Sequence, residues 1–221
     1  MTWTQLLPNL IKGAEVTALI AVASTLLGAV FAFAAGIARV SGGRLLSAIA
    51  LTYIEIFRGT SLLVQLFWLY YALPLIGISF DPIATGIFGL ALNIGAYGAE
   101  VVRGALVSVS EQQREAAKAL NFSGAHTMIH IVLPQAVIEM MPSFCNLAIQ
   151  NLKDTALVSF ISIADLSFHA QSLRNLTLQS VPIYTLTLLI YFAMALVIAA
   201  LMRWLENKLR RGAAFPKGAA S

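Results

Sequence analysis

Hydrophobic residues gather in five long runs that are separated by short polar stretches. Crossing the hydrocarbon core of a bilayer takes about 20 apolar residues in a helix. Runs of this length predict five membrane-spanning helices, at Val16–Ala38, Leu45–Leu73, Ile83–Leu106, Ala136–Ile163 and Ile183–Met202. The pattern therefore predicts an all-α, polytopic membrane protein in which residues 1–221 form a single transmembrane domain.

Two of the runs contain residues that interrupt a straight helix. Glu55, Arg58 and Gly59 fall inside the second run, which is either one tilted helix or two helical pieces. The fourth run holds Pro142 and the pair Lys153-Asp154, and both are expected to break the helix. Because lipid cannot satisfy backbone hydrogen bonds freed by a break, this irregular passage must be sheltered by protein.

Composition supports the membrane assignment. Hydrophobic residues make up 59% of the 221 positions and charged residues 11%, against roughly a quarter charged in a soluble domain. The single cysteine, Cys145, excludes an internal disulfide and a cysteine-built metal site. The N-terminus lacks the basic and apolar pattern of a cleaved signal peptide, so we expect the first span to remain in the mature protein.

Lysine and arginine near the span ends indicate the orientation, because they are enriched in cytoplasmic loops. Only Lys12 and Arg174 lie on one side of the predicted bundle. The other side carries Arg39, Arg44, Arg114, Lys118, Arg203, Lys208, Arg210, Arg211 and Lys217. This asymmetry predicts an outside N-terminus and a cytoplasmic C-terminus with a basic tail, 206–221. The basic charge reports topology and contact with anionic lipid, and it gives no indication of nucleic-acid binding.

The polar segment 111–134, between the third and fourth spans, has the pattern of two short helices. Glu111–Leu120 is rich in strong helix formers, and Asn121 follows where a left-handed residue ends a helix. Ser123 is a candidate cap for a second helix that runs through His130. Two short helices at a turn make a compact cytoplasmic protrusion, although a plain solvated hairpin fits the same residues.

Charged residues inside the spans are costly and therefore informative. Glu55 and Arg58 form one i,i+3 pair, and Glu100 and Arg103 form another. Both pairs lie near predicted span ends, where an arginine can reach the interface. We interpret them as structural pairs that brace the helices under the cytoplasmic loop.

Lys153, Asp154 and Thr155 are the better candidates for a transport path. They lie in an apolar context, and a backbone break at membrane depth is tolerated where it lines a cavity. Adjacent opposite charges suit a zwitterionic solute, although a self-satisfied pair at a helix end fits equally well. Other polar residues could extend the wall of the path or merely bridge helices: Gln65, Asn93, Asn146, Gln150, Asn151 and Asp165.

Several chemistries lack their required residues. His126 and His130 have a metal-compatible i,i+4 spacing, but the loop supplies no intervening glutamate and no acidic third ligand, so we expect no metal site. No G-x-x-x-x-G-K-[ST] loop is present to hold nucleotide phosphates. G-x-S-x-G and H-E-x-x-H are absent as well, which leaves no support for a hydrolase.

The cytoplasmic segment resembles the EAA loop of ATP-binding-cassette (ABC) importer permeases. Glu115, Ala116 and Ala117 match its first residues, Asn121 stands where the family usually has glycine, and the segment ends on Leu133 and Pro134. Three further segments are similar to the polar amino-acid permease branch: FRGTSLLVQLFWLYYALP at 57–74, YGAEVVRGAL at 97–106 and LKDTALVSFISIADL at 152–166.

This resemblance implies a five-helix permease of the type I importer fold in a bacterial inner membrane, paired with a second permease subunit. The loop would couple to an ATPase subunit through Glu115, Ala116, Ala117, Asn121, Leu133 and Pro134. An extracytoplasmic solute-binding protein would dock on the opposite face. ATP and magnesium would bind the ATPase subunit, so this chain is expected to hold no cofactor and to be no enzyme.

The resemblance is greatest to permeases for ectoine and hydroxyectoine, within a branch that carries histidine, glutamine and arginine. An ion-coupled secondary carrier or channel is the alternative, with Glu55, Glu100 and Asp154 binding protons or sodium. Five spans with one docking loop and no inverted repeat favour the importer.

Overall fold

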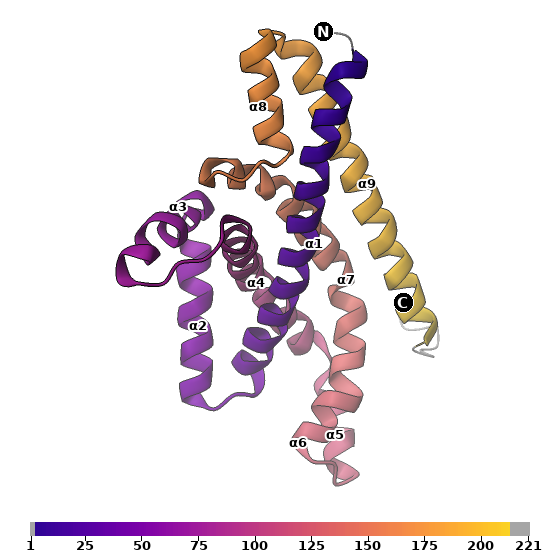
Figure 1. The fold of residues 1–221 in the computed structure, drawn as a ribbon. Coiled ribbons are helices and arrows are strands. Elements are labelled where there is room, and N and C mark those ends of the chain that lie inside the picture. The colour runs from indigo at the N-terminus through magenta and orange to yellow at the C-terminus, as the bar shows by residue number, and fades with distance from the viewer. Residues whose placement is uncertain (1–2, 213–221) are drawn as a thin grey trace.

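The computed structural model describes residues 3–212, and this part of the chain is helical and contains no strand (Figure 1). Three long helices, α1 (Trp3–Ser41), α4 (Pro82–Ser108) and α9 (Ser180–Gly212), each qualify as a membrane span. The stretch Gly124–Ile161 makes a fourth, and a bent helix pair makes a fifth when it is counted as one span. The number of predicted spans is therefore confirmed.

Helix α4 lies at the centre of the bundle and packs against α1, α2 and α7 (Figure 1). Its contact with α1 depends on glycine, because small residues let helix backbones approach closely in membranes. A Cβ atom at Gly36 of α1 would lie 2.6 Å from the Cβ of Val102. One at Gly95 of α4 would lie 2.8 Å from the Cβ of Phe31 and 2.7 Å from the hydroxyl of Tyr53.

The second apolar run forms two helical pieces, which decides between the two sequence interpretations. Helix α2 (Arg44–Gly59) ends at Thr60, and α3 (Leu62–Phe67) begins at an angle of 106° to it. The backbone is extended at Thr60 and Ser61. A π-helical turn, η1 (Trp68–Ala72), and a 3-10 turn, η2 (Leu73–Ile76), complete the second piece.

The fourth run breaks at only one of the two predicted places. Helix α7 (Leu133–Asp154) continues through Pro142, so the predicted break there is wrong. Pro142 is exposed, and a proline inside a helix removes one backbone hydrogen bond, which neighbouring groups and local adjustments can make up for in a membrane protein. The break at Lys153-Asp154 is confirmed, because the chain changes there to a 3-10 segment, η4 (Thr155–Ile161).

A further helix, α8 (Leu166–Thr177), follows the break and was not predicted. Its buried residues Leu166, Ala170 and Leu173 pack with Leu10 of α1 and Ile183 of α9. The 3-10 segment joins the top of α7 sideways to the bottom of α8 (Figure 1). Val158 and Ile161 of this segment are fully buried, in a cluster with residues of α1, α3 and α4. The expectation that protein shelters the irregular passage is confirmed.

Two glycines of α4 provide a matched test of this packing. Gly95→Ala should destabilise the folded protein by about 1–3 kcal/mol, because the new methyl group overpacks the contact with Phe31 and Tyr53. Gly104→Ala should be neutral or slightly stabilising, since no atom lies within 4 Å of its Cβ position. Thermal unfolding of the detergent-solubilised protein measures both variants. Equal unfolding temperatures would contradict the proposed role of Gly95.

Candidate functional site

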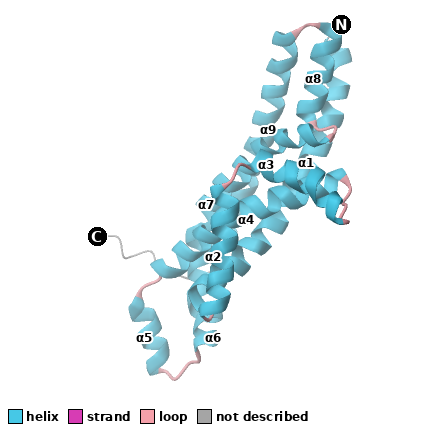
Figure 2. Cartoon of the chain, turned by 90° about the vertical axis from the view of Figure 1, so that its left-hand side faces the viewer, coloured by secondary structure: helices cyan, strands magenta, loops and turns pink. Residues whose placement is uncertain are grey.

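Residues 111–134, named the elbow below, project from one end of the bundle, at the opposite end from α8 (Figure 2). Helix α5 (Glu111–Ala119) is followed by a turn, then by α6 (Gly124–Thr127) and a π-helical turn, η3 (Met128–Val132). Asn121 has φ 60°, so its predicted left-handed conformation is confirmed. The Ser123 hydroxyl accepts from the amide of His126 at 3.3 Å, which confirms the predicted cap.

The elbow presents polar and apolar residues to the solvent. Glu115, Ala116, Asn121 and Pro134 are exposed, whereas Ala117 is buried and Leu133 is partly buried. Three large apolar side chains around the turn are also exposed, namely Leu120 at 68%, Phe122 at 40% and Ile129 at 57%. Such a patch on a polar protrusion is typical of a surface that binds another protein.

A single arginine ties α5 to the end of α4. Arg114 donates from Nη2 to the backbone carbonyl of Leu106 at 2.7 Å. That carbonyl belongs to the last turn of α4, where no intrahelical donor remains. Val132, near the other end of the elbow, and Ala136, just beyond it, are buried in one cluster with Leu106. The elbow is therefore fixed to α4 at both of its ends.

The two elbow histidines stack on each other. Their ring centroids lie 4.1 Å apart, and Nδ1 of His130 lies 3.2 Å from the carbonyl oxygen of His126. Within residues 3–212, no group of three histidine, cysteine or acidic side chains could hold a metal ion.

A cavity of about 450 Å³ opens where α2 breaks into α3. Its polar lining comes from Thr60 and Ser61 at the break, Asn93 and Tyr97 on α4, and Gln150, Asn151 and Asp154 on α7. Leu62, Ile94, Leu147 and Leu157 supply apolar walls. A polar cavity flanked by spanning helices is a suitable place for a solute to pass.

The three residues predicted for the transport path lie in different environments. Asp154 lines the cavity, and its Oδ1 accepts from Nε2 of Gln150 at 2.9 Å. Lys153 is exposed and is not among the lining residues. Thr155 is buried, and its hydroxyl donates to the carbonyl of Leu152 at 2.7 Å. Their part in transport stays a prediction.

Two buried amides hold the break between α2 and α3. Gln65 donates from Nε2 to the carbonyl oxygens of Phe57 and Thr60, at 2.9 and 3.2 Å, and to the Thr60 hydroxyl at 2.7 Å. Asn93 donates from Nδ2 to the same Phe57 carbonyl and to Oε1 of Gln65, both at 3.1 Å. The end of α2 thus finds donors from α3 and α4, and these side chains replace the water that the apolar surroundings lack.

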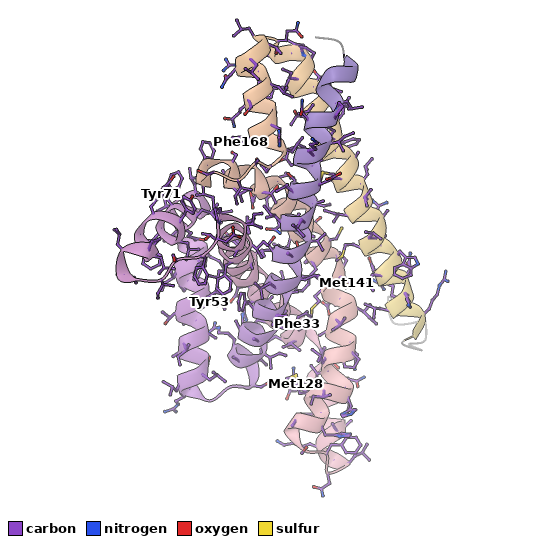
Figure 3. All side chains as sticks on the ribbon, viewed as in Figure 1. Phe33, Tyr53, Tyr71, Met128, Met141 and Phe168 are labelled. Atoms are coloured by element: carbon purple, nitrogen blue, oxygen red, sulfur yellow. The ribbon has the colours of Figure 1, made fainter. Side chains whose placement is uncertain are left out.

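Other polar side chains bridge helices around the cavity. Asn151 donates from Nδ2 to the hydroxyls of Ser24 and Thr25 on α1, at 2.7 and 2.9 Å. Tyr53 points from α2 toward α4, and its hydroxyl donates to the carbonyl of Leu92 at 2.7 Å (Figure 3). Asp165 is buried and caps α8, accepting from the amide of Phe168 at 2.9 Å. The exposed Asn146 is not among the residues that line the cavity.

Only one of the two predicted charge pairs forms. Glu100 and Arg103 are joined at 2.9 Å, as expected for an i,i+3 pair on α4. The predicted ion pair between Glu55 and Arg58 does not form in the described part of the chain. The guanidinium of Arg58 instead lies over the Tyr97 ring, 5.4 Å from its centroid, where the negative face of the ring attracts it.

Residues 24–211 match the family of binding-protein-dependent transport system inner membrane components. The chain belongs to this family.

The relatives narrow the class. The chain is 49% identical over 217 residues to a "probable amino-acid ABC transporter permease protein" of Sinorhizobium fredii, covering 96% of this chain and 91% of the relative. It is 34% identical over 206 residues to the glutamine transport system permease protein of Escherichia coli, covering 92% and 94%. The chain is accordingly an ABC importer permease of the amino-acid type.

Solved structures agree with this assignment. A chain of an amino acid ABC transporter crystallised with histidines is 31% identical in sequence and superposes with a TM-score of 0.84. The match covers 93% of this chain and 96% of the transporter chain. The predicted all-α, type I importer permease fold is confirmed. The relatives are transport subunits rather than enzymes, and they do not favour the secondary-carrier alternative.

Removing one amide of the break should weaken the fold. Gln65→Leu should destabilise the protein by about 1–3 kcal/mol, because it removes the hydrogen bonds of a buried amide to the Phe57 carbonyl and to the carbonyl and hydroxyl of Thr60. Thermal unfolding of the solubilised protein reports the loss. Thr52→Ala is the control, since that exposed hydroxyl bonds only within its own helix, to the Ala48 carbonyl.

A double-mutant cycle with Asn93→Leu refines the test. The sum of the losses in unfolding free energy of the two single variants should exceed the loss of the double variant. The reason is that Gln65 and Asn93 share one hydrogen bond and one carbonyl acceptor. Strict additivity would show that the two amides act independently.

Proposed function

We propose that this chain is one of two permease subunits that carry a polar amino acid, or a zwitterionic amino-acid-like solute, into the bacterial cytoplasm. The main support is that one helix, α4, contributes Asn93 and Tyr97 to the polar cavity and contacts the elbow through its C-terminal end. A solute site and a docking surface on the same helix suit an ATP-driven importer. A carrier that works alone has no use for such a surface.

The proposed orientation puts the elbow in the cytoplasm and the N-terminus outside. Nine basic residues on the elbow side, against two on the other, support it. The N-terminal part of α1 and helix α8 lie at the end opposite the elbow (Figure 2). A solute-binding protein would dock at that outer end. The basic tail, 206–221, lies partly in α9, and its residues 213–221 are outside the described residues.

The elbow is proposed to seat in a cleft of an ABC ATPase subunit, which binds ATP and magnesium. Exposed Glu115, Ala116 and Asn121 would contact that subunit together with the apolar side chains around the turn. Buried Ala117 gives the elbow its shape, because its carbonyl accepts from the amide of Phe122 at 3.0 Å. ATP-driven closure of the ATPase pair would move the elbow, and α4 would move with it.

Pairing with a second permease subunit is supported by one face of α7. Five of its exposed residues are polar and recur at intervals of three or four positions, namely Glu139, Ser143, Asn146, Gln150 and Lys153. Spacing of this kind puts them on one side of the helix. Lipid is a poor environment for such a stripe, so a second subunit and a wet path between the two would cover it.

The solute is proposed only as a class. Sequence resemblance makes ectoine and hydroxyectoine candidates, beside glutamine, histidine and arginine. The lining of the cavity, with carboxylate, amide and hydroxyl groups, suits any small zwitterion. Uptake of each radiolabelled candidate by the complete reconstituted transporter, with and without ATP, identifies the solute. Uptake by this chain alone, without ATP, would support the secondary-carrier alternative.

Reversing the charge of one exposed elbow residue should uncouple the transporter. Glu115→Lys should lower solute-stimulated ATP hydrolysis by about 10-fold or more, because it replaces an acidic contact with a repulsive one. Glu111→Lys is the control, since it makes the same change at an exposed position of the same helix, one turn earlier. Wild-type stimulation in the Glu115 variant would contradict the proposed docking.

The bond between Arg114 and α4 should matter for coupling rather than for assembly. Arg114→Ala should leave ATPase binding intact and lower uptake per ATP hydrolysed several-fold, because α5 loses its hold on the last turn of α4. The matched control is Gln113→Ala, at the exposed neighbouring position. The measurement is the ratio of transported solute to phosphate released in proteoliposomes. An unchanged ratio would show that this bond transmits nothing.

A further inference from the structure

The side-chain amide hydrogens of Asn93 and Asn151, which line the cavity, are already used by the protein. Both hydrogen bonds of the Asn93 amide nitrogen go to residues that do not line the cavity, to the Phe57 carbonyl and to Oε1 of Gln65. The Asn93 oxygen accepts no hydrogen bond within the described residues. It is also not sealed inside the protein. It is therefore the Asn93 atom that a ligand in the cavity can reach.

The broken helix fixes this orientation. A backbone carbonyl can only accept, so the nitrogen of an amide must face the Phe57 and Thr60 oxygens. Turning the Asn93 amide over would bring its oxygen against the Phe57 carbonyl and the oxygen of Gln65. The carbonyls at the end of α2 thus decide, through the Gln65 and Asn93 side chains, which atom of Asn93 faces the solute.

Asn151 repeats the arrangement from α7. Its nitrogen donates to oxygens of α1, at Ala21, Ser24 and Thr25. The Ser24 hydroxyl donates to the Ala21 carbonyl at 3.3 Å, so toward Asn151 it can only accept. The oxygen of Asn151, like that of Asn93, is left for the cavity.

The remaining side chains that line the cavity supply both acceptors and donors. The Gln150 nitrogen donates one hydrogen to Asp154, which leaves its second hydrogen, the Gln150 oxygen and the second carboxylate oxygen of Asp154 available. The Thr60 hydroxyl donates to the Ile56 carbonyl at 2.7 Å. Among the side chains that line the cavity, the hydroxyls of Ser61 and Tyr97 and one amide hydrogen of Gln150 are donors without a partner in residues 3–212.

We propose that this cavity binds the protonated nitrogen group of the solute through its N–H hydrogens, and that it rejects solutes whose nitrogen is fully methylated. The inference rests on the proposed function and narrows its solute class. Ammonium, guanidinium and amidinium groups supply the donors that the oxygens of Asn93, Asn151 and Asp154 need. A trimethylammonium group carries the same charge but has no N–H, so it would displace water from these oxygens without replacing its hydrogen bonds.

Binding is measured on the purified complex of permease and ATPase in lipid nanodiscs, without the solute-binding protein, so that the receptor cannot select the ligand. The probes are radiolabelled L-glutamine, L-arginine and ectoine, together with the Nα-trimethyl derivatives of the two amino acids and glycine betaine. At least one probe with N–H donors should bind about 10-fold or more tightly than its methylated counterpart or glycine betaine. Equal binding of both kinds would overturn the proposal, and so would binding of the methylated kind alone or of no probe with N–H donors.

Two pairs of variants locate the effect. Asp154→Asn should lower affinity for the bound probe about 10-fold, because it removes the charged acceptor, while Glu55→Gln alters an exposed carboxylate that is not a lining residue. Asn93→Leu should reduce the preference for N–H donors. Thr52→Ala changes an exposed residue of α2 that does not line the cavity and should preserve that preference. The idea fails if the preference survives in both Asp154→Asn and Asn93→Leu. ATP-driven uptake in the same complexes tests the proposed function separately.

Discussion

The carbonyl oxygens of Phe57 and Thr60 lie at the end of α2, where the helix has no further backbone donors of its own. Gln65 and Asn93 supply those donors from α3 and α4. Because the amides are committed to these carbonyls, the break keeps its angle of 106°, the cavity beside it stays open, and the atom that Asn93 offers to a solute is an oxygen. Fold, cavity and selectivity thus depend on one requirement of backbone chemistry.

Helix α4 connects this requirement to the cytoplasmic end. Asn93 lies in its middle, and Leu106, near its last turn, accepts from Arg114 and packs against the elbow. The close contact with α1, made through glycines, lets the two helices behave as one body. In the proposed importer, a displacement of the elbow would therefore reach the wall of the cavity through rigid helix rather than through flexible loops.

Sequence patterns predicted the features that depend on local chemistry. The number of spans follows from apolar run length, and the Asn121 turn and Ser123 cap follow from the conformational preferences of those residues. The passage through Pro142 could not be predicted, because surroundings decide whether a proline breaks a helix. Helix α8 is short and moderately polar, and only the Asp165 cap marked its start. The Glu55–Arg58 prediction failed because Tyr97, distant in sequence, competes for the arginine. The cavity requires three segments to meet, and no local pattern reports that meeting.

The central claim is that elbow and α4 move as one body, and distances between spin labels test it directly. One label at Gln112 on α5 and one at Gly104 on α4 occupy exposed positions, and the Cβ site of Gly104 is open. In the complete transporter, this distance should be the same with and without ATP, while the distance between Gly104 labels on the two permease subunits changes. A change in the Gln112–Gly104 distance on ATP binding, with an unchanged distance between the two Gly104 labels, would contradict joint movement of the elbow and α4.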